Sequence, residues 1–485
     1  MTENKPYRPK ARVPRGFRDR DSKEIAAERR MLDTIRRVFE SYGFDALETP
    51  AFEYADALGK FLPDQDRPNE GVFSLEDDDK QWMALRYDLT APLARYVAEN
   101  FQELPKPFRR YQVGTVWRNE KPGPGRYREF TQFDADTVGS ASPAADAELL
   151  MMTSDALEAL GLKRGEYVVK LNSRKLLDGV LEAGSIDADK RGVVLRAIDK
   201  MDRLGPEGVR ALLGKGRKDE SGDFTKGAGL SAAQIDRVLS FLARGGAADV
   251  LEGAAKAVEG SDNGRLGIAE LREIESIVRA CGYQKERIAI DTGIVRGLDY
   301  YTGAVFEAQP LFPVTNEVGA AVAVGSLAGG GRYDDLVARF TGQRVPATGV
   351  SIGVSRFLVA LRSRGLVGAE GLPLIVTLVL DKGDAAASFQ LAGELRAAGL
   401  RAEAYTGEGG MKAQLRYADK RGAAIAVIEG GDELAKGEIT LKDLALGAEL
   451  AKSVESRAEW VKDRPAQISV KRAQLIPELR KLLAR

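Results

Sequence analysis

A basic stretch around a proline and glycine turn is the first place where this sequence could perform chemistry. It reads YQVGTVWRNEKPGPGRYREFTQFDAD over residues 111–136. Guanidinium groups bind phosphates through paired hydrogen bonds, and glycines let a backbone approach a ligand closely. A solvated charged hairpin is the alternative interpretation. Although the whole chain has a formal net charge of +0, a single acid, Glu120, accompanies the cations of this region, which are Lys106, Arg109, Arg110, Arg118, Lys121, Arg126 and Arg128.

Three further stretches combine glycine with side chains that bind or catalyse. IVRGLDYYTG (294–303) carries an arginine, an acid and paired tyrosines, and LAGGGRYDDL (327–336) places three glycines before Arg332 and Tyr333. GVSIGVSRF (349–357) leads small residues into Arg356. The glycine run is not a G-x-G-x-x-G motif and lacks the lysine of a P-loop. Taken alone, each stretch is also compatible with a glycine-lined core strand.

The composition excludes several kinds of catalysis. The chain of 485 residues has no histidine and one cysteine, Cys281. A Ser-His-Asp or Cys-His relay is therefore ruled out, and one cysteine cannot hold zinc alone. We expect no protein-bound zinc or other resident metal. Catalysis must come from arginine, lysine, carboxylates, tyrosine, backbone amides or bound Mg²⁺.

The same composition predicts the setting of the protein. No run of about 18 apolar residues occurs, so we expect no membrane span. The first residues, MTENKPYRPKARVPRGF, lack the apolar region of a signal peptide. A lone cysteine indicates no disulfide framework, and the predicted compartment is the cytoplasm.

The elements that position these residues follow from hydrophobic periodicity. Apolar residues at helical spacing predict a helix after Asp21, and strands at 108–120 and 128–139 predict a hairpin with a long loop, in which Arg118 and Glu120 share one strand face. Thr90 and Pro92 predict an N-cap and first-turn proline of another helix. Helical spacing broken by glycine and charge predicts a helical insertion at 173–285. Strands alternating with helices after residue 370 predict a small α/β domain with a parallel core.

Together the four stretches resemble the class II aminoacyl-tRNA synthetases, and specifically the histidyl-tRNA synthetase family. TVWRNEKPGPGRYREFTQFDAD is similar to motif 2 and GVSIGVSRF to motif 3, while VRGLDYYTG and AGGGRYDDL resemble the two signatures of the histidine enzymes. The resemblance implies an α/β (α+β) fold with an antiparallel sheet flanked by helices, and a C-terminal α/β anticodon-binding domain. It implies a catalytic domain in two parts (1–172 and 286–365), the insertion (173–285) and the anticodon-binding domain (370–485).

The resemblance also implies roles toward ATP. Arg118 matches the arginine that holds the α-phosphate and the substrate carboxylate, and Glu120 matches the acid that reads the adenine amino group. Arg126 lies in the loop that meets the outer phosphates, and Arg356 matches the arginine on the γ-phosphate. Arg296 matches an additional catalytic arginine. The family usually has a glutamate before the motif 3 arginine, where this chain has Ser355.

Roles toward the other two substrates are implied in the same way. Asp88 and Thr90 resemble the pair that holds the α-amino group of histidine, and Gln132 lies beside its carboxylate. The residues that resemble the imidazole-reading set are Asp136, Tyr301 and Tyr333. The implied tRNA contacts are Arg128, Arg416, Lys420 and Arg421.

The implied reaction suits a chain without histidine. ATP with Mg²⁺ activates L-histidine to histidyl-adenylate with release of pyrophosphate, and the histidyl group then passes to the 3′ end of tRNA(His). Because the substrate carboxylate is its own nucleophile, the first step needs positioning and positive charge rather than a general base. The resemblance further implies a homodimer.

Other functions are weighed against this one. A non-catalytic synthetase paralogue, acting as a regulatory subunit in histidine biosynthesis, is the main alternative, but such paralogues typically lack the C-terminal domain and have a damaged RGLDYY signature. A class I synthetase needs histidines for its phosphate-binding signature, and a threonine enzyme needs a zinc site. A generic RNA-binding protein would account for the basic hairpin but not for the two histidine-type signatures.

Overall fold

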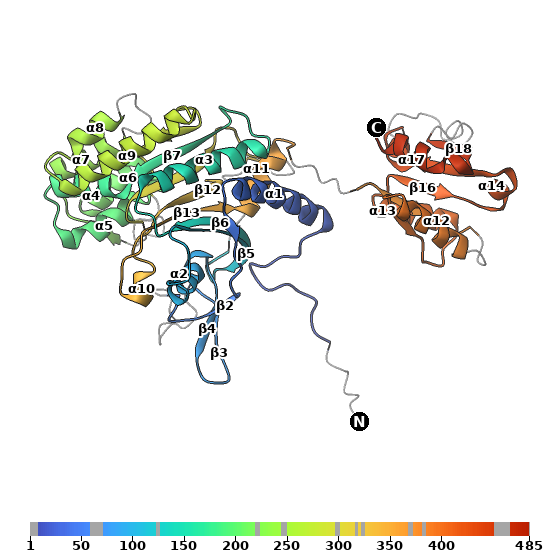
Figure 1. The fold of residues 1–485 in the computed structure, drawn as a ribbon, viewed down its shortest axis with the longest axis horizontal. Coiled ribbons are helices and arrows are strands. Elements are labelled where there is room, and N and C mark those ends of the chain that lie inside the picture. Colours follow the sequence, from blue (N-terminus) through green and yellow to red (C-terminus); the bar gives the residue numbers. More distant parts are fainter. Residues whose placement is uncertain are drawn as a thin grey trace. The chain divides into compact units, whose positions relative to one another are not determined.

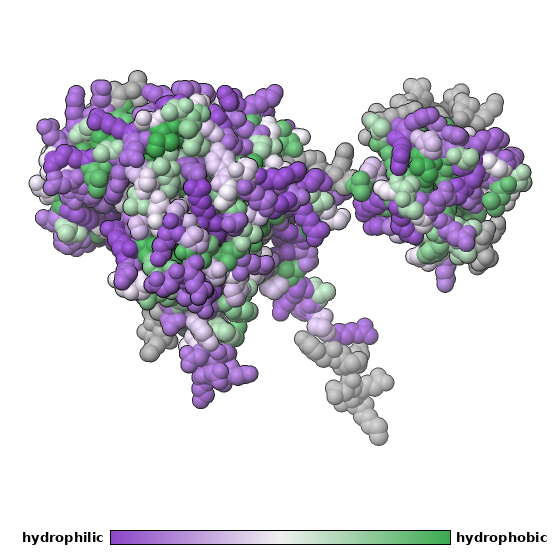
Figure 2. All heavy atoms as spheres, viewed as in Figure 1, coloured by the Kyte–Doolittle hydropathy of each residue, from purple (hydrophilic) through white to green (hydrophobic). Residues whose placement is uncertain are grey.

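A computed structural model describes most of the chain. The described residues are 8–58, 71–122, 127–218, 224–243, 250–295, 301–315, 319–321, 325–366, 372–380, 385–450 and 466–484. The chain divides into two compact units, Met1–Gly368 and Ala369–Arg485. Polar side chains cover much of the face of each unit that Figure 2 shows. Within the described residues, no helix is both long enough and apolar enough to span a membrane.

An eight-stranded sheet forms the centre of the first unit. The inner neighbours are antiparallel, and only the two outer pairs, at either edge, are parallel. The predicted antiparallel sheet flanked by helices is therefore confirmed. In spatial order the strands are β1 (Asp45–Ala46), β5 (Phe108–Trp117), β6 (Glu129–Val138), β13 (Ala347–Gly353), β12 (Ala328–Arg332), β11 (Ala304–Pro310), β7 (Tyr167–Ser173) and β10 (Ile288–Ile290).

The two faces of this sheet carry different side chains because residues alternate along a strand. On β6, Phe133 and Ala135 point into the main hydrophobic core. Helices α1 (Ser22–Ser41), α3 (Pro143–Ala159) and α11 (Val354–Ser363) cover that face (Figure 1). The intervening residues of β6, which are Gln132, Asp134 and Asp136, point to the opposite face. Polar side chains are thus collected on one side of a sheet whose other side is a packed core.

Helices dominate the segment between β7 and β10. The core faces of these helices continue the main hydrophobic cluster, with Leu177, Val238 and Leu271 all buried. A small hairpin, β8 (Gly216–Lys218) with β9 (Phe224–Lys226), was not predicted, since each strand is only a few residues long. The helices are α4 (Arg174–Ala183), α5 (Ala188–Ile198), α6 (Met201–Leu213), α7 (Ala232–Leu242), α8 (Val250–Ala257) and α9 (Asp262–Ala280).

A smaller sheet and two short helices border the polar face. The sheet has the order β2 (Phe52–Tyr54), β4 (Trp82–Leu85) and β3 (Ser74–Glu76). Helix α2 (Thr90–Glu99) follows β4, and α10 (Ala338–Thr341) contacts α2. The predicted N-cap at Thr90 is wrong: the N-cap is Leu89, and the Asp88 carboxylate accepts hydrogen bonds from the backbone of Thr90 and Ala91 instead.

The second unit is a five-stranded sheet with helices. Three neighbouring strands are parallel, as predicted, and the last two add antiparallel. The strands are β15 (Arg401–Ala404), β14 (Leu374–Thr377), β16 (Ile425–Ile428), β17 (Glu438–Asp443) and β18 (Gln467–Lys471). The helices are α12 (Ala385–Ala397), α13 (Met411–Lys420), α14 (Gly431–Lys436), α15 (Leu444–Leu450) and α17 (Leu475–Leu483), with a 3₁₀ turn at Arg472–Gln474.

Candidate active site

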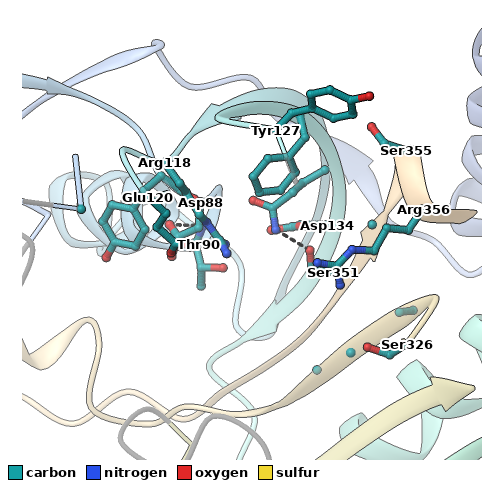
Figure 3. A pocket seen from close by; sticks show the side chains of 18 of the residues that line it. Asp88, Thr90, Arg118, Glu120, Tyr127, Asp134, Ser326, Ser351, Ser355 and Arg356 are labelled. Atoms are coloured by element: carbon teal, nitrogen blue, oxygen red, sulfur yellow. Dashed lines mark hydrogen bonds between the residues drawn. The ribbon is translucent and has the colours of Figure 1, made fainter. Parts of the chain in front are cut away.

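A cavity of about 830 Å³ lies against the polar face of the first unit's sheet. Its wall is built from β6, β12 and β13, the segment before α2, and the first turn of α11 (Figure 3). It also contains side chains that were not predicted, including Tyr127, Asp134 and Ser351. The sequence-predicted residues that line it are Asp88, Thr90, Arg118, Glu120, Gln132, Tyr301 and Arg356.

Glycines provide the space in which the large side chains of the site lie. A Cβ atom at Gly349 would come within 1.9 Å of Asp136 Oδ1, and one at Gly331 would come within 2.9 Å of the Tyr301 ring. Real Cβ atoms do not approach other atoms so closely, because interiors are already close-packed. The glycine-rich run that resembles no phosphate loop is therefore part of the site wall, where it leaves room for a tyrosine.

Arg118 and Glu120 leave the hairpin strand before they reach the cavity. Strand β5 ends at Trp117, so the prediction that the two share a strand face is wrong. The Arg118 backbone N–H still donates to Arg128 O at 2.8 Å, and its Nε donates to Tyr87 O at 3.2 Å. Its guanidinium lies 5.1 Å from the centre of the Phe130 ring. These contacts fix an arginine at the cavity wall without a partner carboxylate in that set.

Arg356 lies in the first turn of α11, next to Ser355, and both line the cavity. Figure 3 shows Arg356 and Arg118 on opposite sides of the space. The N-terminal end of a helix carries partial positive charge. The cavity therefore has positive charge at two sides, which is the arrangement expected for a phosphate chain that runs between them.

Asp88 is held rigidly at the start of α2. Its Oδ1 accepts hydrogen bonds from Thr90 N at 3.1 Å and Ala91 N at 2.9 Å. Burial raises the pKa of this carboxyl, and the backbone hydrogen bonds and Arg118 oppose that shift. Oxygen atoms so placed are suited to bind an ammonium group.

Gln132 and Asp136 occupy the polar face of β6. Gln132 Nε2 donates to Ser351 Oγ at 2.7 Å. Asp136 Oδ2 lies 2.8 Å from Arg110 Nη2, and the Tyr333 hydroxyl donates to the same carboxyl. Burial raises the Asp136 pKa, and Arg110 and Tyr333 oppose this. Asp136 and Tyr333 are not among the residues that line the cavity, and lie behind its wall.

Asp134 is a site residue that sequence reasoning missed. It lies between Gln132 and Asp136 on the same face of β6, and it lines the cavity. Burial, together with the neighbouring Asp136, raises its pKa to about 7, although Arg110 lowers it. The alternation of the strand was the available signal, because residues 132, 134 and 136 must share a face.

The N-terminal segment contacts the far end of the motif 2 hairpin. Arg128 N donates to Gly16 O at 2.8 Å, and Arg128 Nε donates to Glu120 O at 3.0 Å. The Arg18 guanidinium lies 4.7 Å from the centre of the Tyr127 ring. Arg128 does not line the cavity. The predicted residues Arg126 and Arg296 lie outside the described residues.

The remaining cations of the opening stretch have structural partners. Arg110 is 0% exposed and donates to Leu89 O in addition to its pairing with Asp136. Arg109 Nη1 lies 3.2 Å from Glu148 Oε1, and Lys106 Nζ lies 3.9 Å from the centre of the Phe101 ring. The dense positive charge is therefore divided between a buried ion pair, surface contacts and the cavity.

The predicted tRNA contacts of the second unit lie along α13 and at its C-cap. Arg416 and Lys420 are exposed. Arg421 donates to both carboxylate oxygens of Glu403, at 3.1 and 2.9 Å. In the described residues, no group of three or more acidic or cysteine side chains is arranged to hold a metal ion.

Comparisons with known proteins agree with the class that the fold and cavity indicate. An antiparallel sheet with a motif 2 arginine and a motif 3 arginine around one cavity is the catalytic architecture of class II aminoacyl-tRNA synthetases. A family model described as histidyl-tRNA synthetase matches residues 16–357, and one described as anticodon binding domain matches 375–481. The chain therefore belongs to the histidyl-tRNA synthetase family.

Curated relatives extend the match over nearly the whole chain. The protein named Histidine--tRNA ligase of Caulobacter vibrioides is 55% identical over 99% of this chain and 98% of its own. That of Rhizobium leguminosarum is 56% identical over 99% and 97%. The crystal structure of histidyl-tRNA synthetase from Nostoc is similar with a TM-score of 0.74 and 30% identity, and covers 98% of this chain and 100% of that one.

Proposed function

We propose that the cavity joins L-histidine to ATP, forming histidyl-adenylate and pyrophosphate, and that the enzyme transfers the histidyl group to the 3′ end of tRNA(His). The observation that carries this proposal is the meeting of Arg118 and Arg356 with Asp88 and Gln132 in one cavity. Relatives of about 55% identity carry the name of this ligase, which favours catalysis over a regulatory paralogue. The structure titled as a regulatory subunit is 23% identical and is similar in fold alone.

The residues divide the activation step between them. Asp88 and Thr90 hold the substrate ammonium, so that its carboxylate faces the α-phosphorus. Arg118 binds the carboxylate and α-phosphate, and Arg356 binds the outer phosphates that leave as pyrophosphate. Glu120 accepts from the adenine amino group. Arginine remains protonated throughout, so the developing charge on phosphorus is stabilised at every working pH. ATP brings Mg²⁺ as part of the substrate.

The side chain of histidine is recognised at the deep end. Tyr301 lines the cavity, and the Asp136–Tyr333 pair lies behind its wall. A neutral imidazole has one donor and one acceptor, and a site that pairs both rejects amino acids that lack them. Arg126 and Arg296 complete the ATP and histidine sites in this proposal.

The remaining parts serve tRNA and assembly. Arg128, Arg416, Lys420 and Arg421 are proposed contacts to tRNA, with residues 370–485 as the anticodon-binding domain and 173–285 as an insertion between two parts of the catalytic domain (1–172 and 286–365). We also propose a cytoplasmic homodimer. Phe52, Tyr54 and Leu75 support the dimer, because they are exposed apolar side chains on one face of the β2–β4–β3 sheet.

ATP–pyrophosphate exchange with each amino acid in turn tests this function. Exchange is expected with histidine, followed by charging of tRNA(His) when the tRNA is added. Exchange that depends on another amino acid, or none with any, would overturn the proposal.

A further inference from the structure

Asp134 has a spare hydrogen-bond acceptor in the wall of the cavity. The residue is 2% exposed, and its Oδ1 has no hydrogen-bond partner among the residues that the structure describes. Buried polar atoms without a partner are rare in folded proteins, because leaving one unpaired costs free energy. An unpaired carboxylate oxygen in a cavity wall indicates that a bound molecule supplies the donor.

Two neighbours fix the orientation of this carboxyl. Ser351 lies directly opposite Asp134 on β13, and its hydroxyl makes a hydrogen bond to Asp134. Gln132 Nε2 donates to Ser351 Oγ at 2.7 Å, which leaves the hydroxyl proton of Ser351 for Asp134 (Figure 3). One oxygen of Asp134 is thereby occupied and the other is kept in place for a ligand.

The next carboxyl along the strand is already occupied. Asp136 faces Arg110 on β5 and accepts from the Tyr333 hydroxyl, and it does not line the cavity. Its hydrogen-bonding capacity is largely used inside the protein. Asp134, by contrast, belongs to the wall itself, so the two acids of the FDAD sequence have different surroundings although they share a face.

We propose that Asp134 binds the side chain of the amino-acid substrate, with its carboxylate accepting a hydrogen bond from an imidazole N–H. This inference rests on the proposed function. Histidine offers two donors, the ammonium group and the ring N–H. Asp88 and Thr90 lie at the ammonium position, whereas Asp134 lies next to Asp136 and Tyr333 along β6. A hydrogen bond to a charged acceptor contributes about 1.5–3 kcal/mol, which corresponds to roughly 10- to 150-fold in affinity.

The test uses Asp134→Asn in the full chain, with two competitive inhibitors of ATP–pyrophosphate exchange. Imidazolylpropionate keeps the ring but lacks the ammonium group, and thienylalanine keeps the ammonium group but lacks the ring N–H. We expect the KM for histidine and the Ki of imidazolylpropionate to rise together, by about 10-fold or more. The Ki of thienylalanine is expected to stay within about twofold, because its contacts to Asp88 do not change.

Three results would overturn the inference: equal weakening of both inhibitors, weakening of thienylalanine alone, or no change in the KM for histidine. If one inhibitor does not bind the wild-type enzyme, the other still decides. The melting temperature of Asp134→Asn should equal or exceed that of the wild type, since the variant removes a buried charge. Asp45→Asn, on the exposed end of β1, is the matched control and should leave KM unchanged. Histidine-dependent exchange by the wild type tests the proposed function separately.

Discussion

The two ends of the cavity are built from different parts of the fold. At the phosphate end, Arg118 follows the last residue of β5 and Arg356 lies in the first turn of α11. At the amino-acid end, Asp134 and Asp136 lie within a buried strand. Residues at the ends of elements can reach a large, highly charged ligand, whereas a strand interior fixes side chains at a set spacing.

The difference also concerns protonation. Arginine stays charged at any working pH, so the phosphate end has no titration of its own. The carboxyls of the amino-acid end are buried, and burial raises the pKa values of Asp88, Asp134 and Asp136. We infer that pH acts on this enzyme mainly through the recognition of histidine.

The largest effect is expected from Arg118→Ala. Removing a group that stabilises developing charge on phosphorus should lower kcat for ATP–pyrophosphate exchange by about 10³-fold. The melting temperature should change little, because Arg118 is held mainly by a backbone carbonyl and an aromatic ring. A variant that loses less than about tenfold would mean that the phosphate end does not depend on this arginine.

The largest effect at the other end is expected on stability. Asp136→Ala leaves the fully buried Arg110 without its carboxylate, which costs about 3–5 kcal/mol. Thermal unfolding should show a clear fall in melting temperature. The double variant Arg110→Met with Asp136→Leu removes both charges and should recover much of the loss. If it does not recover, the ion pair is not the source of the effect.

Asp134 should give stability a pH dependence of known sign. Its folded-state pKa of about 7 lies above that of an unfolded aspartate. As pH rises from about 4 to about 7, the unfolded chain loses this proton first, so the contribution of Asp134 to stability falls, by at most about 4 kcal/mol. Asp134→Asn should therefore gain stability over the wild type through this range and hold a constant gain above it. Unfolding in urea at pH 4, 6 and 8 measures the difference, and a gain independent of pH would contradict the assignment.

A glycine pair separates space from chemistry at the amino-acid end. Gly349→Ala would place a methyl group against Asp136 Oδ1, whereas the nearest atom to a Cβ at Gly329 is Phe306 O at 3.7 Å. We expect Gly349→Ala to raise the KM for histidine by about tenfold or more through displacement of the acid. Gly329→Ala should have a much smaller effect. Equal effects in exchange assays would show that the close approach to Asp136 has no role.

The smallest effect is expected at the hairpin, outside the cavity. Gly16 has φ +86° and a Cβ there would lie 2.8 Å from Arg128 Cγ, whereas Gly282 has φ +84° with nothing within 4 Å. The two alanine variants share the backbone strain, which is about 1–2 kcal/mol. We expect only Gly16→Ala to raise the KM for tRNA, by a few-fold, in aminoacylation assays. A similar change in Gly282→Ala would remove the proposed role of this contact.

Much of the fold was predictable because periodicity and turn residues act locally. The hairpin of β5 and β6, helix α1 and the parallel strands of the second unit all lie where the sequence indicated. The N-cap of α2 was predicted wrongly because Asp88, two residues earlier than Thr90, reaches the same backbone donors. Local patterns allow both arrangements, and the surrounding packing selects one of them.

The candidate site was predictable in part. Asp88, Thr90, Arg118, Glu120, Gln132, Tyr301 and Arg356 meet in one cavity, while their individual roles stay predictions. Asp134 was missed because its neighbour Asp136 explained the motif by resemblance. No local signal distinguishes the acid that pairs with Arg110 from the acid that faces the cavity, since both lie on the same face of one strand.

The sequence by itself determined the chemistry available to this protein. Without histidine, and with one cysteine, it left arginines and carboxylates to act, and its motifs placed them at the ends of strands and helices. The tertiary structure decided which charges are neutralised internally. Arg110 and Arg118 are alike in sequence, but pairing across the sheet buries the first against Asp136 while the second borders the cavity. That division depends on strand register and burial, which bring together residues far apart in the chain.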